Sequence, residues 1–126
     1  MKSPTHTLLA VAVLAALAAG CASTASQSKP SLSIEQIMED GFKGKESLSA
    51  RISKGQGNEA DFKKMAFLTK ELALNKAPKG DLASWTEKTK ALQAAAESLA
   101  AGKPGALDGF KSAVNCKACH SVHKPD

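Results

Sequence analysis

Apolar side chains recur at helical spacing along most of the chain after residue 33. Positions three or four residues apart share one face of an α-helix, so each such run predicts an amphipathic helix. Four runs occur, separated by segments rich in Gly, Pro and Asn at 54–58, 75–80 and 102–105. No segment shows the apolar–polar alternation that is typical of a strand. The pattern therefore predicts an all-α fold.

The first and last runs set the expected boundaries of this fold. The first run extends from a Ser33 N-cap to Ile52 without a break in its stripe, which predicts one continuous helix. The last run begins at Leu107 and continues through residues 116–120, with no breaker before Pro125. Four helices joined by short loops are expected to pack as an antiparallel, up-down-up-down four-helix bundle.

The N-terminal residues have the pattern of an export signal. Residues 8–19 form an unbroken apolar run, about 18 Å long as a helix, whereas a bilayer core needs about 30 Å. The small residues before Cys21 resemble the lipobox of bacterial lipoproteins, in which the cysteine is acylated. We expect a signal peptide over 1–20 and lipidation of Cys21, with ordinary cleavage and a spare thiol as the alternative.

The polar segment after the expected signal peptide predicts a flexible connection between the membrane anchor and the rest of the chain. Residues 21–32 are small and polar and are expected to form a flexible tether, followed by a helical domain over 33–126. The expected location is the periplasm or the outer surface of a bacterium, with membrane contact through the lipid.

Composition narrows the classes of protein. The chain of 126 residues has 43% hydrophobic residues, too many for a disordered chain, and three Cys, too few for a disulfide scaffold. Aromatic residues make up only 4%, which favours helices and leaves a small core that needs something else to fill it. The net charge is +5, from lysines scattered over every helix and loop. This scatter argues against nucleic-acid binding and favours partners with acidic docking faces.

One motif carries chemistry. Residues 116–120 read Cys-Lys-Ala-Cys-His, the C-x-x-C-H signature of c-type haem attachment. On a helix, Cys116 and Cys119 share a face and can form thioethers to the porphyrin, and His120 can reach the iron as the proximal ligand. A redox dithiol normally needs a βαβ setting, a zinc site needs a second ligand pair, and a disulfide stays as a third alternative. The motif predicts covalently attached haem c.

A C-x-x-C-H motif on the last of four helices resembles class II cytochromes c, the cytochrome c′ group and its low-spin relatives. The resemblance covers residues 33–126. It implies a four-helix bundle with haem bound to the C-terminal helix. The low-spin relatives use a Met of the first helix as distal iron ligand and carry electrons. Cytochromes c′ leave that position empty behind an apolar side chain and bind nitric oxide or carbon monoxide, often as homodimers.

The distal ligand follows partly by elimination. His123 shares the helix of His120 and cannot reach the opposite face of the same iron, which leaves Met38 and Met65 after the signal. Met38 lies near the start of the first helix, as in the low-spin relatives, and Met65 is interpreted as a core residue. We expect Met38 to bind the iron. The alternative is an empty sixth position that Met38 or Phe42 merely covers.

Three further residues are expected beside the haem. Trp85 packs on the ring or donates its indole N–H to a propionate, with a plain core position as the alternative. Phe110 is expected near the ring, and Gly41 is expected to leave room for its edge. No nucleophile–base pair is visible, so we expect an electron carrier and not an enzyme. The predicted function is single-electron transfer between periplasmic or membrane-associated redox partners.

Overall fold

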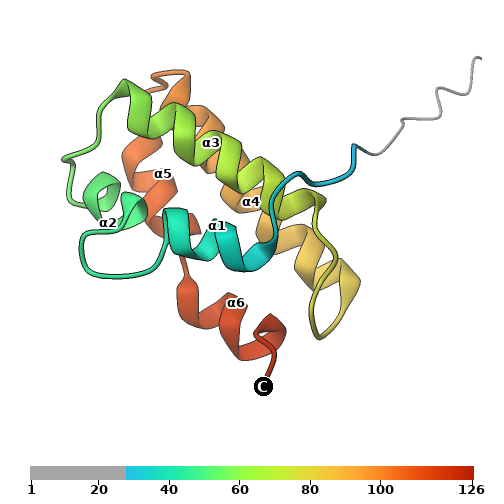
Figure 1. The fold of residues 1–126 in the computed structure, drawn as a ribbon. Coiled ribbons are helices and arrows are strands. Elements are labelled where there is room, and N and C mark those ends of the chain that lie inside the picture. The colour runs from blue at the N-terminus through green and yellow to red at the C-terminus, as the bar shows by residue number, and fades with distance from the viewer. Residues whose placement is uncertain (1–27) are drawn as a thin grey trace, which may run out of the picture.

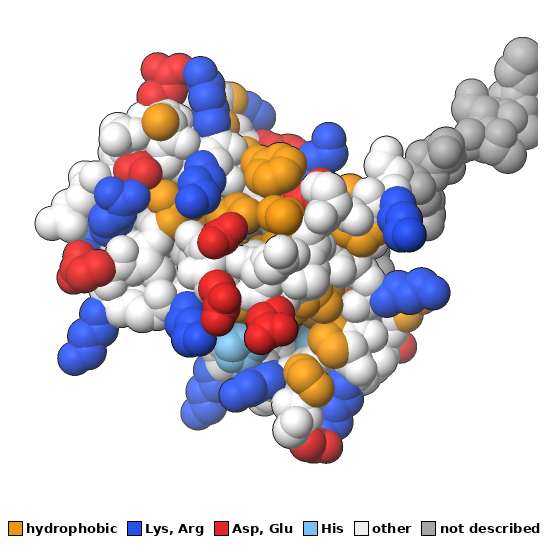
Figure 2. Space-filling model, viewed as in Figure 1, with side chains coloured by type: hydrophobic (Ala, Val, Ile, Leu, Met, Phe, Trp, Pro, Cys, Tyr) orange, Lys and Arg blue, Asp and Glu red, His pale blue; other side chains and the backbone are white. Residues whose placement is uncertain are grey.

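The computed structural model describes residues 28–126 and contains six α-helices and no strand within that range (Figure 1). The helices are α1 (Ile34–Gly41), α2 (Leu48–Ser53), α3 (Glu59–Leu74), α4 (Leu82–Ala100), α5 (Ala106–Ala113) and α6 (Cys116–His123). The predicted all-α class is confirmed. Charged side chains of both signs are interspersed over the face in Figure 2. The predicted signal peptide over 1–20, Cys21 and the predicted tether up to residue 27 lie outside the described residues.

The prediction of one continuous first helix is wrong. α1 ends at Gly41, and α2 begins only at Leu48. Gly44 has a φ of 99°, in the left-handed region that glycine adopts without steric cost. Ser47 then caps α2, because its Oγ accepts a hydrogen bond from the backbone N–H of Ala50 at 3.3 Å. Two short helices and a loop therefore stand where one helix was expected.

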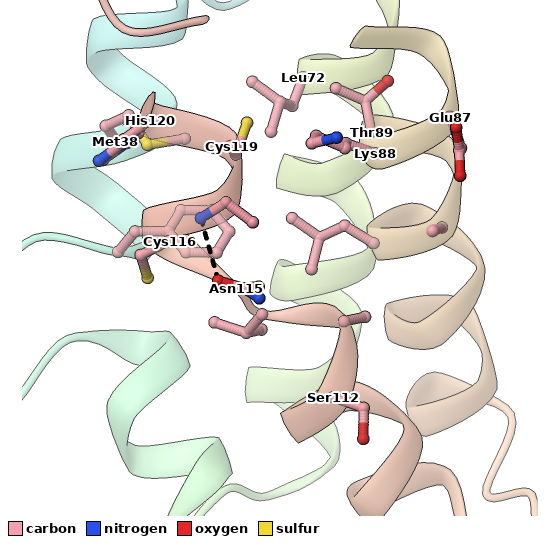
Figure 3. A pocket seen from close by; sticks show the side chains of 16 residues that line it. Met38, Leu72, Glu87, Lys88, Thr89, Ser112, Asn115, Cys116, Cys119 and His120 are labelled. Atoms are coloured by element: carbon pink, nitrogen blue, oxygen red, sulfur yellow. Dashed lines mark hydrogen bonds between the residues drawn. The ribbon is translucent and has the colours of Figure 1, made fainter. Parts of the chain in front are cut away.

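The last predicted helix is also divided. α5 ends at Ala113, and α6 begins at Cys116. Val114 leaves the helical region with a ψ of 75°, and Asn115 follows with a ψ of 82°. The Asn115 side chain accepts a hydrogen bond from the backbone N–H of Ala118 at 3.0 Å, so it caps α6 (Figure 3). The motif thus occupies a short helix of its own, which among the described helices makes close backbone contact with α4 alone.

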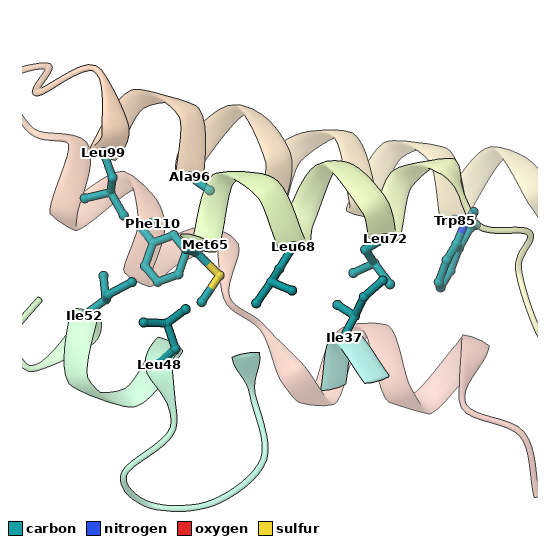
Figure 4. Close-up of a cluster of buried hydrophobic side chains, with 10 residues drawn as sticks. All are labelled: Ile37, Leu48, Ile52, Met65, Leu68, Leu72, Trp85, Ala96, Leu99 and Phe110. Carbon is teal, nitrogen blue, oxygen red and sulfur yellow. The ribbon is translucent and has the colours of Figure 1, made fainter. Parts of the chain in front are cut away.

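The two long helices, α3 and α4, form a hairpin on which the others pack (Figure 1). Asn58 and Asp61 cap the start of α3 reciprocally, and Asp81 caps α4 by accepting from the backbone N–H of Ser84. α1 and α2 contact α3, and α5 contacts α4. Met65 is fully buried, in agreement with its interpretation as a core residue. The core cluster contains Ile37, Leu48, Ile52, Met65, Leu68, Leu72, Trp85, Ala96, Leu99 and Phe110 (Figure 4).

The segment before α1 is fastened to the end of α3. The Glu71 carboxylate accepts hydrogen bonds from the backbone N–H and hydroxyl of Ser31 at 2.6 and 2.9 Å, and from the backbone N–H of Leu32 at 3.1 Å. The Asn75 side chain donates to the Leu32 carbonyl at 2.9 Å. The packed part of the chain therefore begins at Ser31, slightly before the expected domain boundary at Ser33.

The Glu71 carboxylate makes the stability of this attachment depend on pH. Its side chain is 7% exposed. Burial raises the pKa of this carboxyl, but the hydrogen bonds from Ser31 and Leu32, with the charge of Lys70, hold the pKa below its ordinary value. The carboxylate therefore stabilises the fold above the ordinary Glu pKa of about 4.3. That contribution is lost as the pH falls through the lowered value.

We expect Glu71→Gln to reduce the free energy of unfolding at neutral pH by about 1–3 kcal/mol, because hydrogen bonds to a charged acceptor are lost. The difference from the parent protein should shrink as the pH falls below the ordinary Glu pKa of about 4.3 and through the lowered pKa of Glu71, because the parent's side chain then becomes neutral as well. Urea unfolding across this range measures it. Glu97→Gln, at an exposed position, is the matched control. A difference that is independent of pH would contradict the role of the charge.

Candidate functional site

Two adjoining cavities lie between α1 and α6. Their volumes are about 400 and 610 Å³, within the ~300–1,000 Å³ range that is usual for ligand sites. The smaller extends along α4 toward the end of α5, and the larger toward the α3–α4 loop and the C-terminal end of α6. The residues that line both are Met38, Phe42, Leu72, Cys119 and His120. The cavities thus bring together residues from the first, third and last of the described helices.

The motif residues face the smaller cavity from α6. Cys116, Cys119 and His120 all line it (Figure 3). Both thiols are free, and Cys116 is exposed whereas Cys119 is half-buried. Burial and the neighbouring Cys116 raise the pKa of the Cys119 thiol, although the charge of Lys88 opposes them. The His120 imidazole is exposed and has no hydrogen-bond partner within residues 28–126. The helical spacing therefore directs two free thiols and one imidazole without a hydrogen-bond partner in residues 28–126 to the smaller cavity.

Met38 lies on the opposite wall of these cavities. It is half-buried on α1 and lines both cavities together with Cys119 and His120. Gly41, one turn later, faces the core instead, since a Cβ there would lie 3.0 Å from Cδ1 of Leu68. The expectation that Gly41 leaves room in the site is therefore wrong. Its missing side chain allows α1 to approach α3 closely, and this approach places Met38 opposite α6.

Trp85 belongs to the core and also lines the larger cavity. Its side chain is 4% exposed, and its indole N–H donates to the Asn75 carbonyl at 2.9 Å. An indole has a single donor, so this bond leaves none for a propionate. The hydrogen-bonding part of the expectation is wrong, and the alternative of a large core residue at the edge of the site describes Trp85 better.

Phe110 does not line either cavity. It is fully buried on α5, among the core residues Ile52, Met65 and Leu99 (Figure 4). The break between α5 and α6 gives Phe110 different neighbours from those of His120. Closeness of the two residues in the sequence therefore does not mean that they are close in the fold. The structure therefore places Phe110 in the core and apart from the other residues expected beside the haem. Phe42 was expected only as a residue that covers an empty sixth position of the iron. It is the phenylalanine that lines both cavities.

The residues around the cavities fit the group that the motif implies. Two free thiols, an imidazole and a thioether are a suitable set for covalent haem c with His and Met ligands. The five residues shared by both cavities are apolar apart from His120, as an apolar macrocycle requires. In the range 28–126, no cluster of three or more His, Cys, Asp or Glu side chains is arranged to hold a bare metal ion.

Comparison with known proteins adds no relative. No protein-family model matches the chain, and neither a curated protein nor a solved structure does. The described helices also include none that is long and apolar enough to cross a membrane. The site is therefore interpreted from its own residues and their geometry.

Proposed function

We propose that the chain is an exported monohaem c-type cytochrome that passes single electrons between redox proteins. The observation that carries this proposal is the pair of cavities that Met38, Cys119 and His120 line together from α1 and α6. In this proposal the fold is an antiparallel four-helix bundle of class II cytochrome c type. The pair α1–α2 takes the place of its first helix, and the pair α5–α6 takes the place of its last.

The roles of the site residues follow from their chemistry. Cys116 and Cys119 would hold haem c through thioethers, with His120 as the proximal ligand and Met38 as the distal ligand. When bound, haem supplies the one-electron redox chemistry. His120 and Met38 together favour a higher reduction potential than two histidines would. Phe42, on the wall of both cavities, would cover part of the bound haem.

One observation favours a second candidate function, a five-coordinate haem protein that binds nitric oxide or carbon monoxide. Beside Met38, the apolar side chains of Phe42 and Leu72 line both cavities. Such a wall could cover an empty sixth position on the iron without coordinating it. The two candidates share the attachment residues and differ only in whether Met38 is a ligand.

The surface near the site suits a charged protein partner. Lys43 and Lys124 line the larger cavity, and Lys88 lines the smaller one. On the face in Figure 2, lysine or arginine side chains border the exposed histidine surface, with acidic side chains on its other side. A redox partner with an acidic docking face fits the lysine border. An anchor at Cys21, a periplasmic or outer-surface location and a homodimer all belong to the proposal as well.

Covalent haem attachment tests the proposal directly. Produced in a host that matures c-type cytochromes, the protein is expected to keep its haem absorbance after denaturation and organic extraction. The double variant Cys116→Ser, Cys119→Ser should lose covalent haem completely. Cys21→Ser is the matched control and should retain it, because the third cysteine lies outside the motif. Absence of covalent haem from the parent protein would refute both candidate functions.

A further inference from the structure

His123, near the end of α6, is tied to two other parts of the chain. Its side chain is 2% exposed. Nδ1 lies 2.8 Å from the Lys79 carbonyl in the α3–α4 loop, and Nε2 lies 3.1 Å from Oγ of Ser84 on α4. The imidazole also meets Trp85 edge-on, with the ring centroids 5.3 Å apart and the planes at 74°. The buried His123 side chain therefore joins α6 both to the α3–α4 loop and to the first turn of α4.

The partners of His123 select one tautomer. The Lys79 carbonyl can only accept, so Nδ1 carries the hydrogen and donates it. In the neutral ring, Nε2 then accepts from the Ser84 hydroxyl. Lys88 donates from Nζ to the same hydroxyl oxygen at 3.2 Å, which leaves the hydroxyl hydrogen of Ser84 for the imidazole. Both ring nitrogens are used, so His123 is committed to this contact.

Gly80 allows the loop to reach α6 at backbone distance. It has a φ of +83°, and a Cβ there would lie 2.9 Å from the Val122 carbonyl oxygen and 3.0 Å from Nδ1 of His123. Any side chain at this position would therefore push the loop and α6 apart. The contact between the α3–α4 loop and the end of α6 depends on a glycine, a carbonyl and an imidazole that fit one another.

Apart from the packing of the half-buried Cys119 on the core and an exposed ion pair between Lys79 and Asp126, little else determines the orientation of α6. It begins at the break capped by Asn115 and makes close backbone contact with α4 alone among the helices of residues 28–126. Most of its residues are exposed, and His123 is its only buried one. We propose that His123 is the positioning residue of the motif helix, which holds Cys119 and His120 toward Met38. The effect of His123 on iron ligation rests on the proposed function, whereas the contact of His123 with Lys79 and Ser84 does not.

Amide hydrogen exchange of the exported protein tests the contact. We expect His123→Phe, which keeps a ring beside Trp85 but loses both hydrogen bonds, to speed exchange of α6 by about tenfold or more. Exchange of α3 and α4 should stay unchanged. His123→Asn, which can still donate to the Lys79 carbonyl, should recover part of the protection. Ser121→Ala, an exposed change on the same helix, is the control. Unchanged exchange in α6, or equally faster exchange everywhere, would overturn the proposal.

A spectroscopic measurement separates positioning from mere stability. With haem attached, the near-infrared sulfur-to-iron band reports whether Met38 reaches the iron. We expect this band to weaken in His123→Phe, to return in part in His123→Asn and to keep full strength in Ser121→Ala. A full-strength band in His123→Phe would overturn the positioning role. If the parent protein carries no covalent haem, the proposed function fails, and the exchange result still decides whether His123 holds α6.

Discussion

Replacing Met38 with alanine is expected to convert a six-coordinate, low-spin protein into a five-coordinate, high-spin one that binds carbon monoxide at once. Met38 is the only methionine among the residues that line the two cavities. The other imidazole of the described chain, His123, has both nitrogens occupied by Lys79 and Ser84. Neither a second thioether nor a second free imidazole from residues 28–126 is therefore available to replace it. Optical spectra with and without carbon monoxide, including the sulfur-to-iron band, measure the change.

Met65→Leu is the matched control for this substitution. Met65 is fully buried in the core and lines neither cavity, so its removal should leave the iron spectrum unchanged. The exchange of Met for Leu conserves volume and should cost less than about 1.5 kcal/mol of stability. A low-spin spectrum that survives Met38→Ala would refute Met38 as the ligand. A parent protein that is high-spin and responds at once to carbon monoxide would favour the gas-binding candidate.

Phe110→Ala is expected to lower the free energy of unfolding by about 3–5 kcal/mol, the largest stability effect that we predict for one side chain. Phe110 is completely buried, and its ring fills the space between α5 and the core residues of α2 and α3 (Figure 4). Truncation removes its apolar contacts and leaves a cavity. Urea unfolding followed by circular dichroism measures the loss.

The same variant also separates the core from the candidate site. Because Phe110 lines neither cavity, the iron spectrum of Phe110→Ala should equal that of the parent wherever the protein is folded. Phe67→Ala is the control, since Phe67 is 49% exposed on α3 and its truncation should change stability by no more than about 0.5 kcal/mol. A spectral change in folded Phe110→Ala would return this residue to the neighbourhood of the haem.

The sequence predicted the all-helical content of the fold better than it predicted where the helices end. The stripe that joins Met38 to Leu48 and Ile52 continues at helical spacing across residues 42–47, because α1 and α2 both bury their apolar residues against α3. Periodicity alone therefore could not show the loop. The residues that could have indicated the loop between α1 and α2 were Gly44, with its positive φ, and Ser47, the N-cap of α2. In the same way, Asn115 stands directly before the motif as an N-cap, although the apolar pattern of α5 runs up to it.

Other features of the site could not be predicted from local pattern. Helical spacing tells which face of a helix is buried but not which neighbour it meets, so Phe110 and Gly41 were placed beside the site instead of in the core. Glu71 and His123 are polar residues whose partners lie 40 and 44 residues away. Neither partner is visible in a single sequence. Cys119, His120 and Met38 line the same cavities, and their roles as haem-binding residues stay a prediction.

The attachments of α6 and of the segment before α1 have a consequence for the order of folding. Ser31 and His123 are both fastened to the end of the α3–α4 hairpin, through contacts that close loops of 40 and 44 residues. Contacts within the hairpin are more local, and closing a long loop costs entropy before its contacts stabilise anything. The hairpin is therefore expected to form early, and α6 and the segment before α1 are expected to close on it late. The motif helix is expected to dock last, so under the proposed function even the half-buried Cys119 would be open to haem attachment before the fold is complete.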